Sequence, residues 1–329
     1  MRVLVTGGAG FIGSQFVRRL AEQGEQVVVL DKLTYAGNRA NLEGVDHEFH
    51  HGDIADPDAV ERAGSGCEAI VNFAAETHVD RSILGPAEFI LTDVLGTQVL
   101  LDHARRHGLR HVQVSTDEVY GDVPVDAPPC TEDTPLRPSS PYSASKAGGD
   151  LQVLAYVRTY GIDAVVTRGA NTFGPRQYPE KIIPLFVTNA LDGEPLPVYG
   201  DGRQRREWVH VDDHCSAIEL ALRTGESGEV YNVGGQEREN LEVVRRILDL
   251  TGASADLVRM VADRPGHDRR YAMDSSKVRA LGWAPRHSFD AGGLEETVAW
   301  YRENREWWEP IKSGDYRRYY ETQYAHRLG

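Results

Sequence analysis

The feature that most constrains the fold of this chain is a glycine-rich turn at residues 7–13, directly after an apolar segment at Arg2–Thr6. Glycines at its first, fourth and seventh positions permit a tight turn, and they let backbone N–H groups at a helix N-terminus approach a pyrophosphate. Asp31 ends the next apolar segment, where a carboxylate that binds the adenosine ribose is expected. Because that carboxylate would repel a 2′-phosphate, the pattern predicts a dinucleotide-binding unit that prefers NAD to NADP.

Apolar and amphipathic segments alternate through the first half of the chain. The apolar segments predict strands at Arg2–Thr6, Gln26–Asp31, Glu48–His51, Ala69–Ala74, His111–Ser115 and Ala164–Arg168. The amphipathic segments predict helices at Ile12–Gln23, Pro86–His107 and Tyr142–Tyr160. Alternation of this kind forms a parallel sheet through right-handed crossovers. We therefore predict an α/β fold in which a doubly wound parallel Rossmann sheet is joined to a second, smaller α/β substrate domain.

The pattern changes after residue 170, where prolines interrupt the chain and an arginine-rich run occupies residues 203–206. A helix is predicted at Asp212–Arg223, and a short strand at Val230–Val233 is expected to rejoin the sheet. Helices and loops follow from about Leu241, while the tail from Trp307 shows no clear pattern. We expect an NAD-binding domain at residues 1–170, to which 212–235 return, and a substrate-binding domain at 171–211 and 236–329.

Composition excludes several classes of protein. The net charge of −14 argues against a nucleic-acid-binding protein, so an anionic ligand needs a local basic cluster. Cys67, Cys130 and Cys215 lie far apart without a C-x-x-C pair, which is typical of a reducing cytoplasm. No apolar run is long enough to span a membrane, and we expect no secretion signal because the first strand begins at once.

Other chemistries lack their motifs. The G-x-S-x-G turn of serine hydrolases does not occur in the sequence. His47, His50 and His51 cluster without the spacing of zinc ligands, so no metal site is predicted. The arginine run and the basic residues near 176, 181, 269 and 270 are either solvated charge or a clamp for a diphosphate, and in so acidic a chain the clamp is favoured.

Two neighbouring carboxylates, Asp117 and Glu118, follow the strand predicted at His111–Ser115. Sheets of this type place reacting groups at the carboxyl ends of their strands. When both carboxylates are buried, ionising both is costly, so one keeps its proton while the other acts as a base. That division suits the elimination of water. On a solvated loop the same pair would have no special role.

Tyr142 and Lys146 lie one helical turn apart on one face of a predicted helix. An ammonium group beside a phenol favours the phenolate, so we expect the pKa of Tyr142 to be lowered toward neutrality. Such a phenolate takes a hydroxyl proton as a hydride leaves. The same spacing occurs on surface helices, but here it follows a nucleotide-binding half and a helix cap at residues 139–141. This context favours a catalytic pair.

Eight segments carry a family resemblance that extends over nearly the whole chain: Val5–Ser14, Asp31–Asn38, Ala74–Ser82, Ser115–Gly121, Pro141–Lys146, Pro179–Pro184, Arg206–Val211 and Asp263–Tyr271. Together they resemble the extended short-chain dehydrogenase/reductase family, and within it the nucleotide-sugar 4,6-dehydratases. The resemblance implies a soluble cytoplasmic homodimer that pairs through the helices near 86–107 and 142–160.

The resemblance also implies a reaction. Tyr142, aided by Lys146 and Thr116, takes the C4 hydroxyl proton of a nucleotide-bound hexose while hydride passes to NAD. Glu118 then removes the C5 proton, and protonated Asp117 assists the departure of the C6 hydroxyl as water. Hydride returns to C6, so NAD is unchanged over the cycle and the product is a 4-keto-6-deoxy sugar.

The expected contacts fall into two sets. Those with NAD are Gly7, Gly10, Phe11, Ile12, Gly13, Asp31, Lys32, Asp53, Ile54, Ala74, Tyr142 and Lys146. Those with the nucleotide-sugar substrate are Thr77, His78, Asn171, Lys181, Arg206, Asn232 and Arg269.

Some residues depart from the family pattern and leave alternatives open. Thr172 and Phe173 stand where the family commonly has asparagine and tyrosine, and residues 169–170 read Gly-Ala where Cys-Ser is common. These changes leave the hexose open, and the choice between thymine and uracil is also open. An epimerase or decarboxylase of the same fold typically carries serine in place of Asp117. A non-catalytic NAD-binding protein would be expected to have lost part of the catalytic set, which is complete here.

Overall fold

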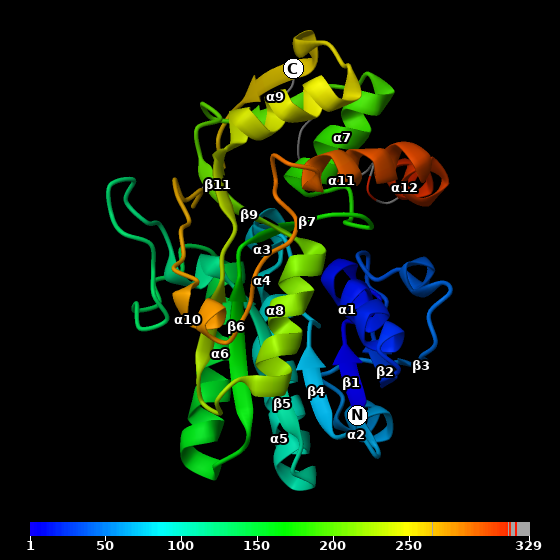
Figure 1. Cartoon of the computed structure of the whole chain (residues 1–329), viewed down its shortest axis with the longest axis vertical. Coiled ribbons are helices and arrows are strands. Elements are labelled where there is room, and N and C mark those ends of the chain that lie inside the picture. Colours follow the sequence, from blue (N-terminus) through cyan, green and yellow to red (C-terminus); the bar gives the residue numbers. More distant parts are fainter. Residues whose placement is uncertain (265, 315, 317–319, 321–329) are drawn as a thin grey trace.

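The computed structural model describes residues 1–264, 266–314, 316 and 320. Its largest feature is a parallel sheet with the strand order β10-β6-β5-β4-β1-β2-β3 (Figure 1). The strands are β1 (Arg2–Thr6), β2 (Gln26–Asp31), β3 (Glu48–His51), β4 (Ala69–Asn72), β5 (Arg110–Thr116), β6 (Ala164–Gly169) and β10 (Val230–Val233). The order reverses between β1 and β4, as in a doubly wound Rossmann sheet. The predicted fold class is therefore confirmed.

Helices cover both faces of this sheet because successive residues of a strand point to opposite sides. Val3 and Val5 of β1 belong to the core that includes α1 (Phe11–Glu22) and α8 (Val211–Thr224). Leu4, between them, belongs to the core under α2 (Pro57–Gly64) and α5 (Thr97–His107). The long helix α6 (Pro141–Tyr160) packs beside α5 and on β5 and β6.

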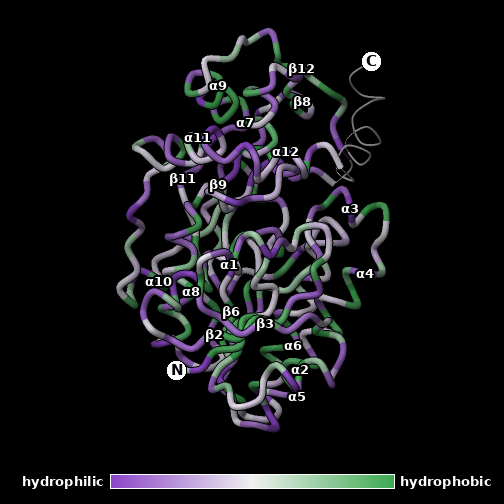
Figure 2. The backbone as a smooth tube through the Cα atoms, turned by 90° about the vertical axis from the view of Figure 1, so that its right-hand side faces the viewer, coloured by the Kyte–Doolittle hydropathy of each residue, from purple (hydrophilic) through white to green (hydrophobic). Residues whose placement is uncertain are grey.

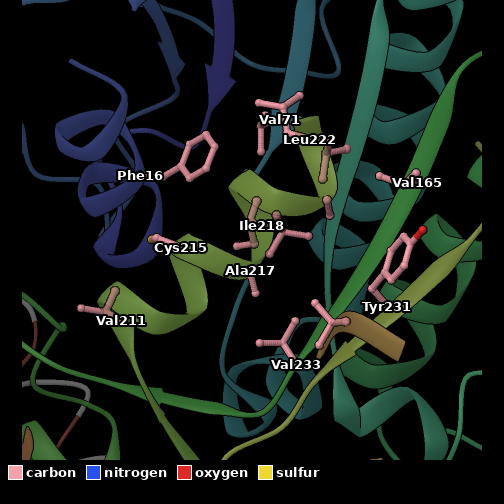
Figure 3. Packing of buried hydrophobic residues seen from close by; sticks show 14 of the residues in the cluster. Phe16, Val71, Val165, Val211, Cys215, Ala217, Ile218, Leu222, Tyr231 and Val233 are labelled. Carbon is pink, nitrogen blue, oxygen red and sulfur yellow. The ribbon is translucent and has the colours of Figure 1, made fainter. Parts of the chain in front are cut away.

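The helix α8 closes one face of the sheet. Its residues Cys215, Ala217, Ile218 and Leu222 pack between Phe16 of α1 and the strands (Figure 3). The strand that follows, β10, pairs in parallel with β6 at the sheet edge. The helix α8 and the strand β10 therefore both pack with the large sheet.

A second region is built around smaller sheets, at the top of Figure 1. One has the order β11-β9-β7, and β12 pairs with β8. The elements are β7 (Asn171–Phe173), α7 (Ile182–Asp192), β8 (Leu196–Tyr199), β9 (Arg205–His210), β11 (Gln236–Glu239), α9 (Asn240–Thr251), β12 (Val258–Val261), α11 (Gly293–Glu303) and α12 (Arg305–Ser313). They enclose a separate apolar cluster that includes Phe173, Ile247 and Trp308. Its five short strands were not predicted, because segments of three to six residues carry no clear period.

The two clusters are separate, and the division at 1–170 with 212–235, and at 171–211 with 236–329, stays a prediction. One segment departs from it. Met273, Val278 and Trp283 pack into the core of the large sheet, and α10 (Ser276–Ala280) lies against β10. The chain thus returns to the first region a second time. The residues after 320 in the proposed second domain lie outside the described part.

The helix expected at Pro86–His107 is interrupted. It consists of α4 (Pro86–Ile90), a π-helical segment η2 (Leu91–Gly96) and α5, and it is preceded by α3 (Val79–Leu84). The wider turn of η2 carries Asp93, whose Oδ2 accepts a hydrogen bond from Ser145 Oγ in α6 at 2.5 Å. Three short 3₁₀ helices complete the description: η1 (Arg39–Leu42), η3 (Asp117–Tyr120) and η4 (Ala255–Leu257).

Among the described residues, no helix has the length and apolar character needed to cross a lipid bilayer.

Candidate active site

The glycine turn between β1 and α1 is packed so tightly that larger residues cannot replace Gly7 or Gly13. A Cβ on Gly7, which has φ +68°, would lie 2.5 Å from the backbone nitrogen of Ala74, and one on Gly13 would lie 2.2 Å from the carbonyl oxygen of Gly7. Gly10 precedes α1 and offers no capping side chain. The first N–H groups of α1 are therefore available to a pyrophosphate.

The carboxylate of Asp31 is oriented by the backbone. Its Oδ2 accepts the N–H of Ala9 at 2.9 Å and its Oδ1 accepts the N–H of Leu33 at 2.8 Å. Each oxygen keeps a second lone pair that is suited to a ribose hydroxyl. Beside it, Lys32 Nζ lies 2.8 Å from Asp53 Oδ2, and both side chains line the same cavity. These residues fit the adenosine half of NAD.

One cavity of about 330 Å³ joins this turn to the ends of β4, β5 and β6. Its walls include every residue that the sequence assigned to NAD and to catalysis: Gly7, Gly10, Phe11, Ile12, Gly13, Asp31, Lys32, Asp53, Ile54, Ala74, Thr116, Asp117, Glu118, Tyr142 and Lys146. The residues predicted for the cofactor and those predicted for the reaction thus line a single space at the carboxyl edge of the sheet. Contact with NAD or substrate stays a prediction for each of them.

The surroundings of Asp117 raise the pKa of its carboxyl group and so favour its protonated form. It is 3% exposed, its Oδ1 accepts a hydrogen bond from Thr116 Oγ1 at 3.0 Å, and its Oδ2 has no hydrogen-bond partner among the described residues. Burial, followed by repulsion from Glu118, raises the pKa of Asp117 to about 7. A carboxyl group with this pKa keeps its proton near neutral pH and can donate it.

Glu118 sits in a more positive field than its neighbour. Burial raises the pKa of Glu118, but the positive charges of Arg264, Lys181 and Arg206 oppose that rise. Both carboxyl groups thus have a raised pKa, and three positive side chains favour the carboxylate form of Glu118, which a base requires.

The expected lowering of the pKa of Tyr142 is contradicted by the structure. Burial, together with the negative charges of Glu118, Asp93 and Asp117, raises this pKa well above its usual value. Lys146 is buried, and its Nζ donates a hydrogen bond to the carbonyl oxygen of Val114 at 2.9 Å. Burial and three nearby carboxyl groups favour the neutral phenol, and the spacing of Tyr142 and Lys146 carries no information about either.

The helix that carries Tyr142 and Lys146 begins as the sequence indicates. Ser140 caps α6, since its hydroxyl accepts the N–H of Ser143 while the Ser143 hydroxyl accepts the N–H of Ser140. This reciprocal cap fixes the first turn of α6. Tyr142 therefore stands at a defined place beside the end of β5.

Three of the seven predicted substrate residues line the cavity. Lys181 Nζ donates a hydrogen bond to Thr77 Oγ1 at 3.2 Å, which joins the loop after β4 to the start of α7. Asn171 lies at the start of β7, and its buried Oδ1 has no hydrogen-bond partner among the described residues. An unsatisfied buried oxygen at a cavity wall suits a ligand hydroxyl.

The other four predicted substrate residues do not line this cavity. They are His78, Arg206, Asn232 and Arg269. Arg206 Nη2 donates to the carbonyl oxygen of Asp268 at 2.8 Å, and its guanidinium lies over the ring of Tyr271. His78 is buried with φ +80°, and its Nδ1 lies 3.8 Å from Asp80 Oδ2.

The side chains of Asn232 and Arg269 bind other parts of the protein instead of lining the cavity. Asn232 is fully buried in β10, where its Oδ1 accepts from Tyr120 and its Nδ2 donates to the carbonyl oxygen of Cys130. Arg269 is 42% exposed and pairs with Asp201 at 2.7 Å. Neighbours that are distant in sequence occupy both side chains, so their contact with substrate stays a prediction.

Two further residues belong near the site and were not singled out from the sequence. Glu180 lines the cavity and accepts hydrogen bonds from Tyr35 at 2.9 Å and from Arg81 at 3.0 Å. Arg264 is the positive charge that most strongly opposes the rise in the pKa of Glu118. Both residues lie inside segments that carried the family resemblance, and only that resemblance could have identified them from the sequence.

The chain matches known proteins over almost its full length. Residues 4–296 match the family model described as GDP-mannose 4,6 dehydratase. The dTDP-glucose 4,6-dehydratase of Streptomyces niveus is 56% identical over 96% of this chain and 97% of that protein. The dTDP-glucose 4,6-dehydratase 1 of Escherichia coli K12 is 46% identical over 99% of this chain and 100% of that protein.

Solved structures agree with these matches. The crystal structure of DesIV, the dTDP-glucose 4,6-dehydratase from Streptomyces venezuelae with NAD and TYD bound, superimposes with a TM-score of 0.92 at 56% identity, covering 95% of this chain and 100% of that one. The Thermus thermophilus UDP-glucose 4-epimerase in complex with NAD reaches 0.87 at 36% identity, covering 92% and 100%. The chain therefore belongs to the dTDP-glucose 4,6-dehydratase family, NAD-dependent lyases with a short-chain dehydrogenase/reductase fold.

Proposed function

We propose that this protein is a hydro-lyase that converts dTDP-glucose to dTDP-4-keto-6-deoxyglucose, with NAD regenerated in each cycle. The observation that carries this proposal is the pair Asp117 and Glu118 on the cavity wall, one carboxyl group with a pKa of about 7 beside another that lies among positive charges. Oxidation at one carbon needs a single base. Elimination of water needs an acid as well, and Asp117 supplies it.

Bound NAD supplies a hydride acceptor for C4 and a hydride donor for C6. The chain provides the base at the C4 hydroxyl, for which Tyr142 is proposed. Thr116, beside the Tyr142 phenol, opposes the rise in its pKa. Burial and the negative charges of Glu118, Asp93 and Asp117 favour the neutral phenol. Lys146 lies one helical turn away on the same face of α6. The positive charge of an oxidised nicotinamide would shift the balance toward the phenolate.

Elimination follows from the two carboxyl groups. A ketone at C4 acidifies the C5 proton, which Glu118 removes. Asp117 donates its proton to the C6 hydroxyl, which then leaves as water. Since Asp117 ends the step as a carboxylate, its Thr116 hydrogen bond and the positive charge of Arg206 stabilise the form that the step produces.

The experiment that tests the function is incubation of the purified protein with dTDP-glucose. We expect a product that has lost one water and that shows the alkaline ultraviolet absorbance of a 4-keto-6-deoxy sugar. A product of unchanged mass with an inverted C4 centre would instead identify an epimerase of the same fold. A parallel series of UDP-, CDP- and GDP-hexoses measures the preference for the nucleotide, because pockets discriminate a single methyl group weakly.

A homodimer is part of the proposal. Several large apolar side chains are exposed on α3, α4, η2 and α6: Leu84 at 69%, Ile90 at 51%, Leu91 at 47%, Leu95 at 41% and Leu151 at 57%. Figure 2 shows hydrophobic stretches of the tube at α3 and α4. Light scattering should give twice the chain mass for the wild type, and Leu151→Asp should shift the protein toward the monomer.

We also propose a cytoplasmic location. Cys67, Cys130 and Cys215 are buried free thiols, which suits a reducing compartment. Fractionation of cells that express the tagged protein tests this, and activity in the membrane or secreted fraction would contradict it.

A further inference from the structure

A group of metal-ligating side chains lies outside the active site, between α2 and α5. Glu61 comes from α2, and His103 and His107 come from the last two turns of α5. One ligand atom from each of these residues lies within 4.8 Å of the others. We propose that Glu61, His103 and His107 form a binding site for a divalent transition-metal ion, with zinc as the ion that fits best.

The distances suit a zinc ion. His103 Nδ1 lies 3.1 Å from Glu61 Oε2, and His107 Nε2 lies 3.0 Å from Glu61 Oε1. In a tetrahedral site with bonds of about 2.0–2.1 Å, neighbouring ligand atoms are roughly 3.3 Å apart. Both imidazole-to-carboxylate distances are therefore within about 0.3 Å of those in a zinc site. Two imidazoles and a carboxylate are also the ligand set of several zinc sites, which keep their fourth position for water.

The scaffold holds both histidines in place. His103 and His107 are four residues apart on one face of α5, and their rings lie 4.4 Å apart. His103 is 1% exposed and packs beneath α2 so closely that a Cβ on Gly64 would lie 2.2 Å from its Nε2. Its Nδ1 is the ring nitrogen that faces Glu61. A side chain fixed in this way loses little further freedom when it binds a metal.

Glu61 and His107 keep the site open to solvent, since their side chains are 45% and 43% exposed. Arg106 competes for the carboxylate, because its Nη1 lies 3.3 Å from Glu61 Oε2. Exposed ion pairs of this kind contribute little to stability, and side chains at the surface exchange partners readily. The arginine can therefore move aside when a divalent ion arrives.

The position of the site indicates a structural role. It lies at the C-terminal end of α5, which runs opposite to the strands, so it is at the far edge of the sheet from the catalytic cavity (Figure 1). An ion there cross-links α2 to α5 and touches none of the cavity residues. We expect it to stabilise the NAD-binding half without changing the chemical step.

A second group, His210, Asp212 and His287, is the other candidate among the described residues. Its carboxylate-to-imidazole distances are longer, 3.7 and 3.8 Å. His210 Nδ1 already accepts the backbone N–H of Asp212. This group is therefore less ready to bind an ion, and it remains intact in the variants below as an internal comparison.

Titration of the intact, metal-free enzyme with zinc chloride tests the proposal, with cobalt(II) absorbance as a second measurement. We expect one ion per chain, a tetrahedral cobalt spectrum, and affinity that falls by about tenfold or more in His107→Ala. His107 is exposed at a helix end, so this variant should fold. The matched control is His50→Ala, which removes another exposed histidine that pairs with a glutamate, Glu48, at 2.7 Å.

Stability and activity complete the test. Zinc should raise the Tm of the wild type and of His50→Ala but not that of His107→Ala, while kcat on dTDP-glucose stays the same. No zinc binding by the wild type would overturn the proposal. So would equal binding by His107→Ala, or a zinc effect on kcat in both proteins, which would place the ion elsewhere.

Discussion

Two buried aspartates near the β5–β6 pair show how this molecule separates structure from chemistry. Asp150 of α6 is fully buried, and its Oδ2 accepts a hydrogen bond from Arg168 Nε at 2.9 Å. Asp117 is almost as buried, yet no arginine or lysine in the described part of the chain lies within ion-pair distance of it. Burial raises the pKa of both carboxyl groups, but Arg168 opposes the rise only for Asp150. Asp150 therefore serves the fold, and Asp117 is kept able to donate a proton.

Arg168 lies close to both aspartates in the fold but, among the described residues, forms an ion pair with Asp150 alone. Arg168 of β6 lies opposite Ser115 of β5, and Ser115 is two residues before Asp117 in the sequence. Its Nη1 donates to the Tyr120 hydroxyl at 2.8 Å, so the guanidinium is held away from the cavity. A cation turned toward Asp117 would lower its pKa and remove the acid.

The largest expected effect comes from Asp117→Asn. An amide cannot supply the proton, so water loss from dTDP-glucose should slow by roughly 10²–10⁴. Oxidation at C4 should persist, and it is measured as NADH absorbance in a single turnover. The matched control is Asp126→Asn, a change at an exposed aspartate. Full dehydratase activity in Asp117→Asn would show that another group is the acid.

The second change is Arg168→Met, which leaves Asp150 buried without its partner. Removing one member of a buried ion pair costs about 3–5 kcal/mol in the free energy of unfolding. Urea denaturation measures this loss. Arg2→Met removes the exposed pair with Glu48 and should cost about 1 kcal/mol or less. Equal losses in the two variants would mean that burial of the Arg168 pair has no energetic consequence.

The pH dependence of the reaction tests the ionisation of Asp117. Above the pKa of this group, the rate of water loss should fall about tenfold for each pH unit. The pKa of Asp117, about 7, lies above that of the unfolded chain, so the acid is protonated below that value and is lost as pH rises through it. The rate of water loss should therefore fall above pH 7. The same ionisation destabilises the fold as pH rises, and Asp117→Asn should remove that component. A rate that is flat from pH 6 to pH 9 would contradict the assignment.

The smallest effect is expected from Thr116→Val. The Thr116 hydroxyl lowers the pKa of Asp117 by donating to its Oδ1, so the variant should move the descending limb of the profile to higher pH. One hydrogen bond to a charged group is worth about 1.5–3 kcal/mol, which corresponds to a shift of roughly one to two pH units. A shift to lower pH would show that the hydrogen bond favours the protonated form.

The large sheet was predictable because its strands are buried on both faces. Such strands appear as continuous apolar runs, and the observed bounds of β1, β2 and β10 equal the predicted ones. The edge strand β3, which is polar and only partly buried, also has the predicted bounds. The π-helical segment η2 was not predictable, since it depends on Asp93 reaching Ser145 of another helix. The short strands β7, β9 and β11 likewise depend on partners far away in the sequence.

The sequence by itself determined what local geometry can specify: the glycine turn, the carboxylate of Asp31 at the end of β2, the Tyr142–Lys146 spacing and the two carboxyl groups after β5. Only the tertiary structure decided which of them are buried and what surrounds them. It raised the pKa of Tyr142 instead of lowering it, and it paired Arg269 with Asp201 away from the cavity. The physical reason is that burial and Coulomb interactions depend on neighbours brought together from distant parts of the chain, and residue spacing carries no information about those neighbours.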